Sequence, residues 1–155
     1  MLGPSTSSRL CSVLLALVFS GIGACGGCSK LIPPEPLKMH AIEFGTGIDA
    51  ESKITSPTKT FSPESTVYIS IETEGAGKGT LVVDWAANST VVEGQKQTYT
   101  TIVDTQRLEI NPTGPAHFAF HFVPEDGWPK GTNRVRFTLE GSVDTDRHVA
   151  EFEVE

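Results

Sequence analysis

Apolar and polar residues alternate along most of the chain beyond residue 38. In TVYISIE, residues 66–72, every second residue is a branched apolar one, and Tyr68, Ser70 and Glu72 stand between them. A period of two is typical of a β-strand with one buried face. Segments with this pattern direct the following side chains inward: Ile42, Phe44, Val67, Ile69, Ile71, Leu81, Val83, Trp85, Phe118, Phe120, Phe122, Val135, Phe137, Leu139, Ala150, Phe152 and Val154.

Weaker strands of less certain register are predicted at residues 89–92, 98–103 and 107–110. After the leader, no window of ten or more residues carries apolar side chains at the spacing of a helix face. The pattern therefore predicts an all-β fold of about seven to nine short strands in two packed antiparallel sheets.

The first 24 residues have the layout of an export signal. Arg9 is followed by an apolar stretch, residues 10–19, and by small residues that end at Ala24. About ten residues of helix extend roughly 15 Å, which is too short for a hydrocarbon core of about 30 Å. We expect residues 1–24 to be a signal peptide that is removed, not a permanent membrane span.

The end of this leader, Ile22-Gly23-Ala24-Cys25, resembles the lipobox of bacterial lipoproteins. The resemblance implies that the Cys25 thiol is joined to diacylglycerol and that the leader is cut just before it. The alternative is an ordinary secretory signal with an incidental cysteine. In that family an Asp after the cysteine retains the protein at the inner membrane, so Gly26 implies the outer membrane, facing the periplasm.

Cys28 is open to three interpretations. It could belong to a second lipobox in the wrong register, to a Cys-x-x-Cys redox pair with Cys25, or to neither. A reactive pair of this kind usually lies at the start of a helix. A glycine-rich segment offers no such context, so a bystander role is favoured.

A tether separates the anchor from the domain. Residues 25–38 comprise the lipidated Cys25 and the tether. Residues 26–38 hold glycines followed by Pro33, Pro34 and Pro36, and they predict a semi-rigid, extended stalk of roughly 35–40 Å. The remaining residues, 39–155, have the length of a single sandwich domain.

Several phrases together resemble a recurrent family of bacterial lipoproteins and secreted proteins with an immunoglobulin-like β-sandwich: IEFGTGID, TKTFSPESTVYISIETEG, LVVDWAAN, GWPKGTNRVRFTLEG and AEFEVE. The resemblance covers roughly residues 41–155. It implies the fold of the domain but no particular activity. Ser65 departs from a usual Asp, and Asn133 from a usual Tyr, which puts a tyrosine-corner hydrogen bond in doubt. Trp85 is expected in the core, whereas Trp128 could either pack on the core or contact a partner.

The chain carries 19 acidic and 12 basic residues. An acidic surface repels phosphate backbones, so nucleic acid is not an expected partner. Arg134 and Arg136 share the outer face of one predicted strand, with Lys130 nearby, and form a candidate anion-contact patch. Protection of an edge strand by charge explains the two arginines equally well.

No motif for catalysis, metal binding or a cofactor is present. His117 and His121 lie about 13 Å apart along a strand, too far for one ion to join. GAGKG, residues 75–79, lacks the full spacing of a phosphate loop and is interpreted as a hairpin turn. We therefore expect no metal, no cofactor and no enzyme activity.

Together these features predict a non-enzymatic, lipid-anchored protein of the bacterial cell envelope that acts as a binding or adapter module. Its expected partners are the membrane, through the lipid at Cys25, and an envelope protein or glycan, with Trp128, Arg134 and Arg136 as candidate contacts. The alternative is a structural or assembly subunit of an envelope complex. A hydrolase is the least favoured option.

Overall fold

The computed structural model describes residues 34–89, 99–142 and 145–155, with side chains omitted for 88–89 and 99–100. The chain divides into two units, Met1–Ile32 and Pro33–Glu155, and the second contains all of the described residues. The signal peptide, Cys25 and Cys28 lie outside the described residues. The described part is all-β, with no helix.

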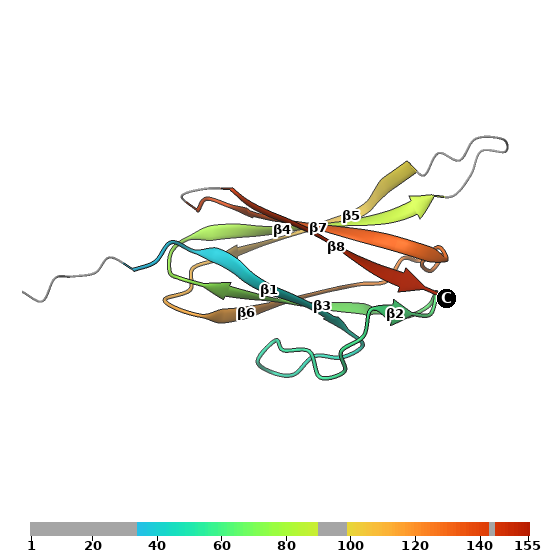
Figure 1. Cartoon of the computed structure of the whole chain (residues 1–155), viewed down its shortest axis with the longest axis horizontal. Helices are drawn as coiled ribbons and strands as arrows, with labels where there is room; N and C mark the ends of the chain where they lie inside the picture. The colour runs from blue at the N-terminus through green and yellow to red at the C-terminus, as the bar shows by residue number, and fades with distance from the viewer. Residues whose placement is uncertain (1–33, 90–98, 143–144) are drawn as a thin grey trace, which may run out of the picture. The chain divides into compact units, whose positions relative to one another are not determined.

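In the part of the chain that the structure describes, eight strands form two sheets that face each other (Figure 1). One sheet has three strands in the order β1-β3-β6, and the other has five in the order β2-β8-β7-β4-β5. The strands are β1 Lys38–Gly45, β2 Thr60–Phe61, β3 Val67–Glu74, β4 Gly79–Ser89, β5 Tyr99–Ile110, β6 Ala116–Phe122, β7 Gly131–Glu140 and β8 Asp146–Val154.

This arrangement is an immunoglobulin-like sandwich, as the sequence predicted. The chain passes between the sheets from β1 to β2, from β2 to β3, from β3 to β4, from β5 to β6 and from β6 to β7. Trp85 on β4 is fully buried between the sheets, which is where such domains place a tryptophan. One pairing is not antiparallel, because β2 runs parallel to β8 over two residue pairs, Thr60 with Glu153 and Phe61 with Val154.

The alternating pattern identified the core correctly. Every second residue of β3, β4, β7 and the end of β8 is buried, and Ile42, Phe118, Phe122 and Ala150 pack against this cluster while partly exposed. The ring of Phe152 contacts those of Phe44 and Phe61, at centroid distances of 6.0 Å and 5.5 Å. Burial of one such ring contributes about 1.5–3 kcal/mol, so the core holds the sheets together without a disulfide.

The middle of the chain differs from the prediction. The segments at 98–103 and 107–110 are parts of one strand, β5, which pairs with β4 along its whole length. Its register shifts at Trp85 and Ala86, where a β-bulge interrupts the alternation. That irregularity makes one long strand look like two short ones. The predicted strand at 89–92 lies outside the described residues apart from Ser89, which ends β4.

The GAGKG segment is not a hairpin turn, because β3 and β4 belong to different sheets. It carries the chain from one layer to the other, with Gly75 at φ 80° and Gly77 at φ 138°. A side chain on Gly75 would also overlap the carbonyl oxygen of Pro36. Glycine is needed here for both backbone conformation and close approach.

The folded unit begins before the expected boundary at residue 39. Ala76 donates its backbone N–H to the Glu35 carbonyl at 3.0 Å, and Leu37 is only 4% exposed. The Met39 N–H donates to Asp146 Oδ2 at 2.8 Å, which fastens β1 to the start of β8.

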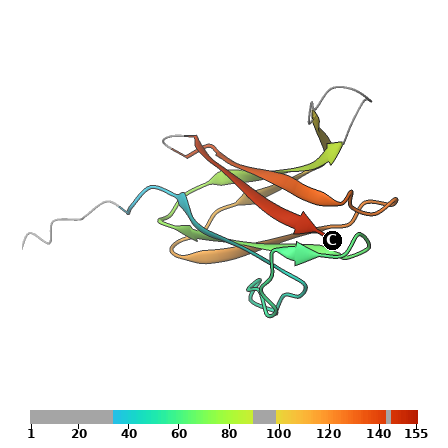
Figure 2. The same cartoon turned by 45° about the vertical axis from the view of Figure 1, so that its right-hand side comes forward.

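The outer face of the three-stranded sheet is partly covered. Ser70 points outward as predicted, yet it is only 3% exposed. The segment between β1 and β2 runs below this sheet in Figure 2, and its Lys53 and Ile54 line a cavity of about 210 Å³ together with Ser70, Glu72 and His117. Ser70 is buried because the segment between β1 and β2 covers it, although its place in the alternating pattern directs it outward.

Candidate functional site

The outer face of the five-stranded sheet carries a group of residues that we call the arginine face. Pairing across β5, β4, β7 and β8 places its side chains in three rows on the same side of the sheet. The rows are Arg107, Val82, Thr138 and Arg147; then Thr105, Asp84, Arg136 and Val149; then Ile102, Ala86, Arg134 and Glu151.

The candidate contacts Arg134 and Arg136 lie at the centre of this face. Strand β7 has β8 and β4 on its two sides, so edge protection does not explain its arginines. The Nε of Arg134 lies 2.7 Å from a Glu151 oxygen, an ion pair on an exposed surface. Lys130 precedes β7 and is exposed, but it belongs to none of the three rows.

Arg136 is held only loosely. Its guanidinium lies 4.0 Å from Asp84 Oδ2, and the side chain is 58% exposed. The other oxygen of Asp84 accepts a hydrogen bond from the Thr105 hydroxyl at 2.8 Å. Since Asp84 is already shared, most hydrogen-bonding capacity of the Arg136 guanidinium is left for another acceptor.

Two further arginines complete the face. Arg107 forms an ion pair with Glu140, on the neighbouring row toward the start of β4. Arg147 is exposed and forms no ion pair with any residue that the structure describes. These two could not be identified from the sequence, because only the pairing of the strands reveals that they share a face with Arg134 and Arg136.

Apolar side chains are interspersed among the arginines. Val149 is 64% exposed and Ile102 is 51% exposed, whereas Val82 and Ala86 are almost covered by longer neighbouring side chains. A shallow depression of about 250 Å³ lies here, lined by Asp84, Ala86, Ile102, Arg134, Arg136 and Val149. The face thus combines cations with exposed apolar groups, a combination suited to binding another macromolecule.

Trp128, the third candidate contact, is buried. It is 2% exposed, and its ring centroid lies 4.9 Å from that of Phe152 and 5.6 Å from that of Phe122. Its Nε1 donates to the Ser65 carbonyl at 3.2 Å. The packing interpretation is confirmed, and Trp128 is not part of the exposed contact surface.

Three of the four histidines have local partners. His40 Nδ1 lies 3.1 Å from Glu74, His148 Nε2 lies 3.0 Å from Asp146, and the His121 ring stacks on Tyr68 at 5.5 Å. Among the described residues, no three His, Cys, Asp or Glu side chains are grouped so that they could hold a metal ion.

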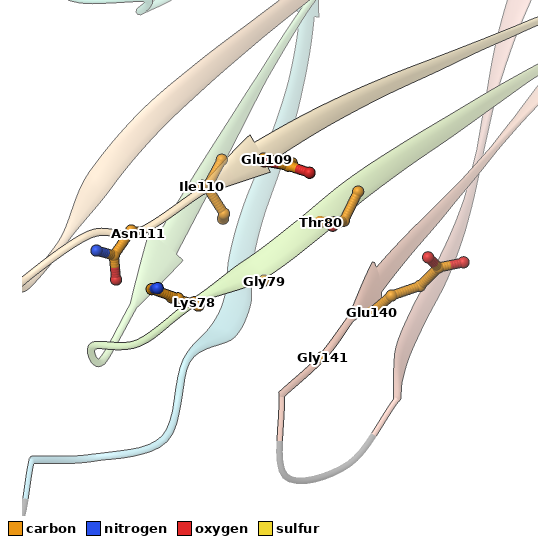
Figure 3. Close-up of a pocket in the computed structure, with 8 residues that line it drawn as sticks. All are labelled: Lys78, Gly79, Thr80, Glu109, Ile110, Asn111, Glu140 and Gly141. Carbon is orange, nitrogen blue, oxygen red and sulfur yellow. The ribbon is translucent and has the colours of Figure 1, made fainter.

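A larger cavity, of about 650 Å³, lies at the end of the domain where β4 begins (Figure 3). Lys78 and Asn111 flank one part of it, and Glu109 and Glu140 contribute carboxylates from β5 and β7. No aromatic ring lines it, so it lacks a platform on which a sugar could stack. Sequence reasoning missed this cavity because its residues come from separate strands.

Within the described residues, no helix has the length and apolar character needed to cross a membrane. No protein-family model and no curated protein matches the chain.

Solved structures that resemble the domain include β-glucosidases. One from Erythrobacter marinus aligns over 79% of this chain with 10% identity and a TM-score of 0.45. One from Listeria innocua in complex with glucose aligns over 78% with 14% identity and a TM-score of 0.42. The chain covers 16% of the length of each enzyme, and a likeness of this size says nothing about activity.

Proposed function

We propose that the protein is a non-enzymatic, lipid-anchored binding module of the bacterial cell envelope, most simply at the outer membrane and facing the periplasm. The observation that carries the proposal is the position of Cys25. It follows a leader of export type and lies ten positions before Glu35, whose carbonyl accepts a hydrogen bond from Ala76 of the sandwich. A lipid at Cys25 would therefore hold the sandwich within about 30–35 Å of the bilayer.

The manner in which the tether joins the domain supports this role. Glu35, Leu37 and Met39 are fixed by backbone hydrogen bonds or by burial at the end of the sandwich where β1 and β4 begin. Two or three acyl chains bind a membrane essentially permanently, because each buried methylene contributes about 0.8 kcal/mol. A short tether then keeps the domain close to the membrane and leaves its sheet faces accessible to partners.

The test is fractionation of the full chain in a bacterial host, with Cys25→Ser compared with Cys28→Ser as the matched control. We expect the wild type and Cys28→Ser to enter the membrane fraction and the detergent phase. Cys25→Ser should keep its leader or become soluble. If Cys25→Ser is cleaved and membrane-bound like the wild type, the lipid anchor is ruled out.

The alternative is an assembly subunit that pairs through a sheet edge. Strand β5 lies at the edge of the five-stranded sheet, and its Val103 and Leu108 are 42% and 38% exposed. An exposed edge of this length can accept a strand from another chain. Co-migration with a large detergent-solubilised complex, abolished by Val103→Pro, would favour this alternative over the binding module.

A further inference from the structure

We propose that the arginine face binds a carboxylate-rich, extended segment of a partner protein, with Arg136 and Arg147 as its carboxylate ligands and Val149 as its apolar contact. This inference rests on the domain being a binding module, and it is independent of the lipid at Cys25. It identifies the surface and the chemistry of the partner.

The distribution of cations on the domain is the first argument. All four arginines that the structure describes lie in the three rows of this face, and no lysine does. The described lysines lie on β1 or in connecting segments: Lys38, Lys53, Lys59, Lys78 and Lys130. Protein interfaces are enriched in arginine and depleted of lysine. An arginine also binds a carboxylate through two parallel hydrogen bonds, which lysine cannot do.

Charge complementarity is the second argument. The three rows contain four arginines against Asp84 and Glu151, and Glu140 of the adjoining row is paired with Arg107, so one positive charge is left over here on a chain of formal net charge −7. Glu151 is engaged by Arg134, and Asp84 is shared between Thr105 and Arg136. The excess positive charge lies on Arg136 and Arg147.

The geometry of these two arginines fits an extended peptide. Arg136 pairs with Val149 and Arg147 pairs with Thr138, so the two arginines are diagonal neighbours on β7 and β8. Diagonal neighbours in a sheet are about 7–8 Å apart. Carboxylates two residues apart on an extended strand are separated by about 6.6 Å, so an Asp or Glu pair at that spacing can reach both guanidinium groups.

Val149 supplies an apolar contact between the charges. It is the most exposed of the large apolar side chains in the described residues, at 64%, and it lies opposite Arg136. An apolar side chain of the partner that covers it would also exclude water from the neighbouring ion pairs. Desolvation of this kind strengthens charge-assisted hydrogen bonds.

The surroundings favour a protein segment over a membrane or nucleic acid. Glu109, Glu140, Glu151 and Glu153 point outward around the arginines on the same side of the sheet. An extended anionic surface would meet these carboxylates as well as the arginines and be repelled. A narrow peptide can place its carboxylates on Arg136 and Arg147 alone.

The face is open to such a partner. Between β1 and β2 the chain covers part of the other sheet, but no described segment crosses the outer side of β4, β7 and β8 in either view (Figures 1 and 2).

The test is a binding titration of the full-length, processed chain in detergent with a fluorescent synthetic peptide of alternating Glu and Val. A peptide of alternating Lys and Val is the charge control. Phosphatidylglycerol vesicles test the membrane alternative, after the chain has been transferred from detergent into nanodiscs of neutral phosphatidylcholine. The variants are Arg136→Glu with Arg147→Glu, and Arg136→Lys with Arg147→Lys. Lys38→Glu with Lys53→Glu is the matched control, since it makes the same charge change away from this face.

We expect the Glu-Val peptide to bind and the arginine-to-glutamate pair to weaken binding by about tenfold or more, since it removes charge-assisted hydrogen bonds and places like charges against the carboxylates of the peptide. The arginine-to-lysine pair, which keeps the charge, should still weaken binding severalfold, and the lysine control should change it less than about twofold. The proposal is overturned if the Glu-Val peptide does not bind. It is also overturned if the arginine-to-glutamate pair and the Lys38→Glu with Lys53→Glu control weaken binding equally. Vesicle binding that requires Arg136 and Arg147 overturns it as well. These outcomes leave cleavage and lipidation at Cys25 unaffected, so failure here is distinguishable from failure of the anchor.

Discussion

The indole nitrogen of Trp128 donates a hydrogen bond to the backbone carbonyl of Ser65, 3.2 Å away. The Trp128 backbone N–H also donates to the Pro63 carbonyl at 2.7 Å. These two bonds join the turn before β7 to the turn before β3, which belongs to the other sheet. The neighbouring Trp85 is fully buried, and its Nε1 has no hydrogen-bond partner among the described residues.

The two tryptophans should therefore respond differently to the same substitution. Trp128→Phe removes ring volume and a hydrogen bond, and leaves the Ser65 carbonyl without its donor. Trp85→Phe removes the same volume and relieves an unpaired buried donor, which offsets part of the cost. We expect Trp128→Phe to lower the free energy of unfolding by at least about 1 kcal/mol more than Trp85→Phe does. Urea unfolding measures both, and an equal loss would contradict the difference in hydrogen bonding.

The buried side chain of Asn133 stabilises the turn at the start of β7 through hydrogen bonds. It is 0% exposed, and its Nδ2 donates to the carbonyls of Pro129 at 2.9 Å and Gly131 at 3.1 Å. Asn133→Leu should cost about 2–3 kcal/mol, since it leaves buried acceptors unpaired. The exposed Asn111→Leu is the control and should change stability by less than about 0.5 kcal/mol. An Asn133→Leu variant as stable as the wild type would show that the turn does not depend on the side-chain hydrogen bonds of Asn133.

Gly75 tests the junction between tether and domain. Gly75→Ala places a side chain at φ 80° and against the Pro36 carbonyl, so we expect a loss of at least about 2 kcal/mol. Gly114, whose added Cβ would meet nothing within 4 Å, is the matched control. Limited proteolysis should cut Gly75→Ala faster between residues 33 and 37. Equal cleavage of both variants would show that the junction does not depend on this contact.

Asp49 makes the segment between β1 and β2 sensitive to acid. Its Oδ1 accepts the backbone N–H groups of Lys53 and Glu51, each at 2.9 Å, and these bonds lower the pKa of Asp49. A lowered folded pKa means that this contribution is present above about pH 4 and is lost as the pH falls through the folded value. The amide chemical shifts of Glu51 and Lys53 should change below about pH 4. Asp49→Asn should abolish that transition, and a midpoint above pH 4 would contradict the assignment.

Most of the fold could be predicted from the alternation of apolar residues, because each strand buries one face against a common core. Val67, Ile69 and Ile71 illustrate this, since all three are fully buried. The alternation gave wrong predictions where a bulge or a covering segment changed which residues are buried or paired. The bulge at Trp85 and Ala86 divided β5 in the pattern, and a covering segment buried Ser70. Residues 75–79 look like a hairpin turn in the sequence. Their glycines indicate a turn but do not reveal whether the following strand belongs to the same sheet or to the other one.

The candidate site was predictable only in part. Arg134 and Arg136 could be assigned to one face because they are two residues apart on one strand. Arg107 and Arg147 could not be added, since their position depends on the order β8-β7-β4-β5. Trp128 could not be assigned between core and surface from sequence, because its burial depends on Phe122 and Phe152 from other strands.

The most direct test of the central claim is the intact mass of the mature protein, isolated from bacteria grown with a clickable fatty acid. We expect a chain that begins at Cys25, carries the mass of a diacylglycerol-linked and acylated cysteine, and takes up the label. Cys25→Ala should take up none. A mature chain that starts elsewhere, or that has no added lipid mass, would contradict the account.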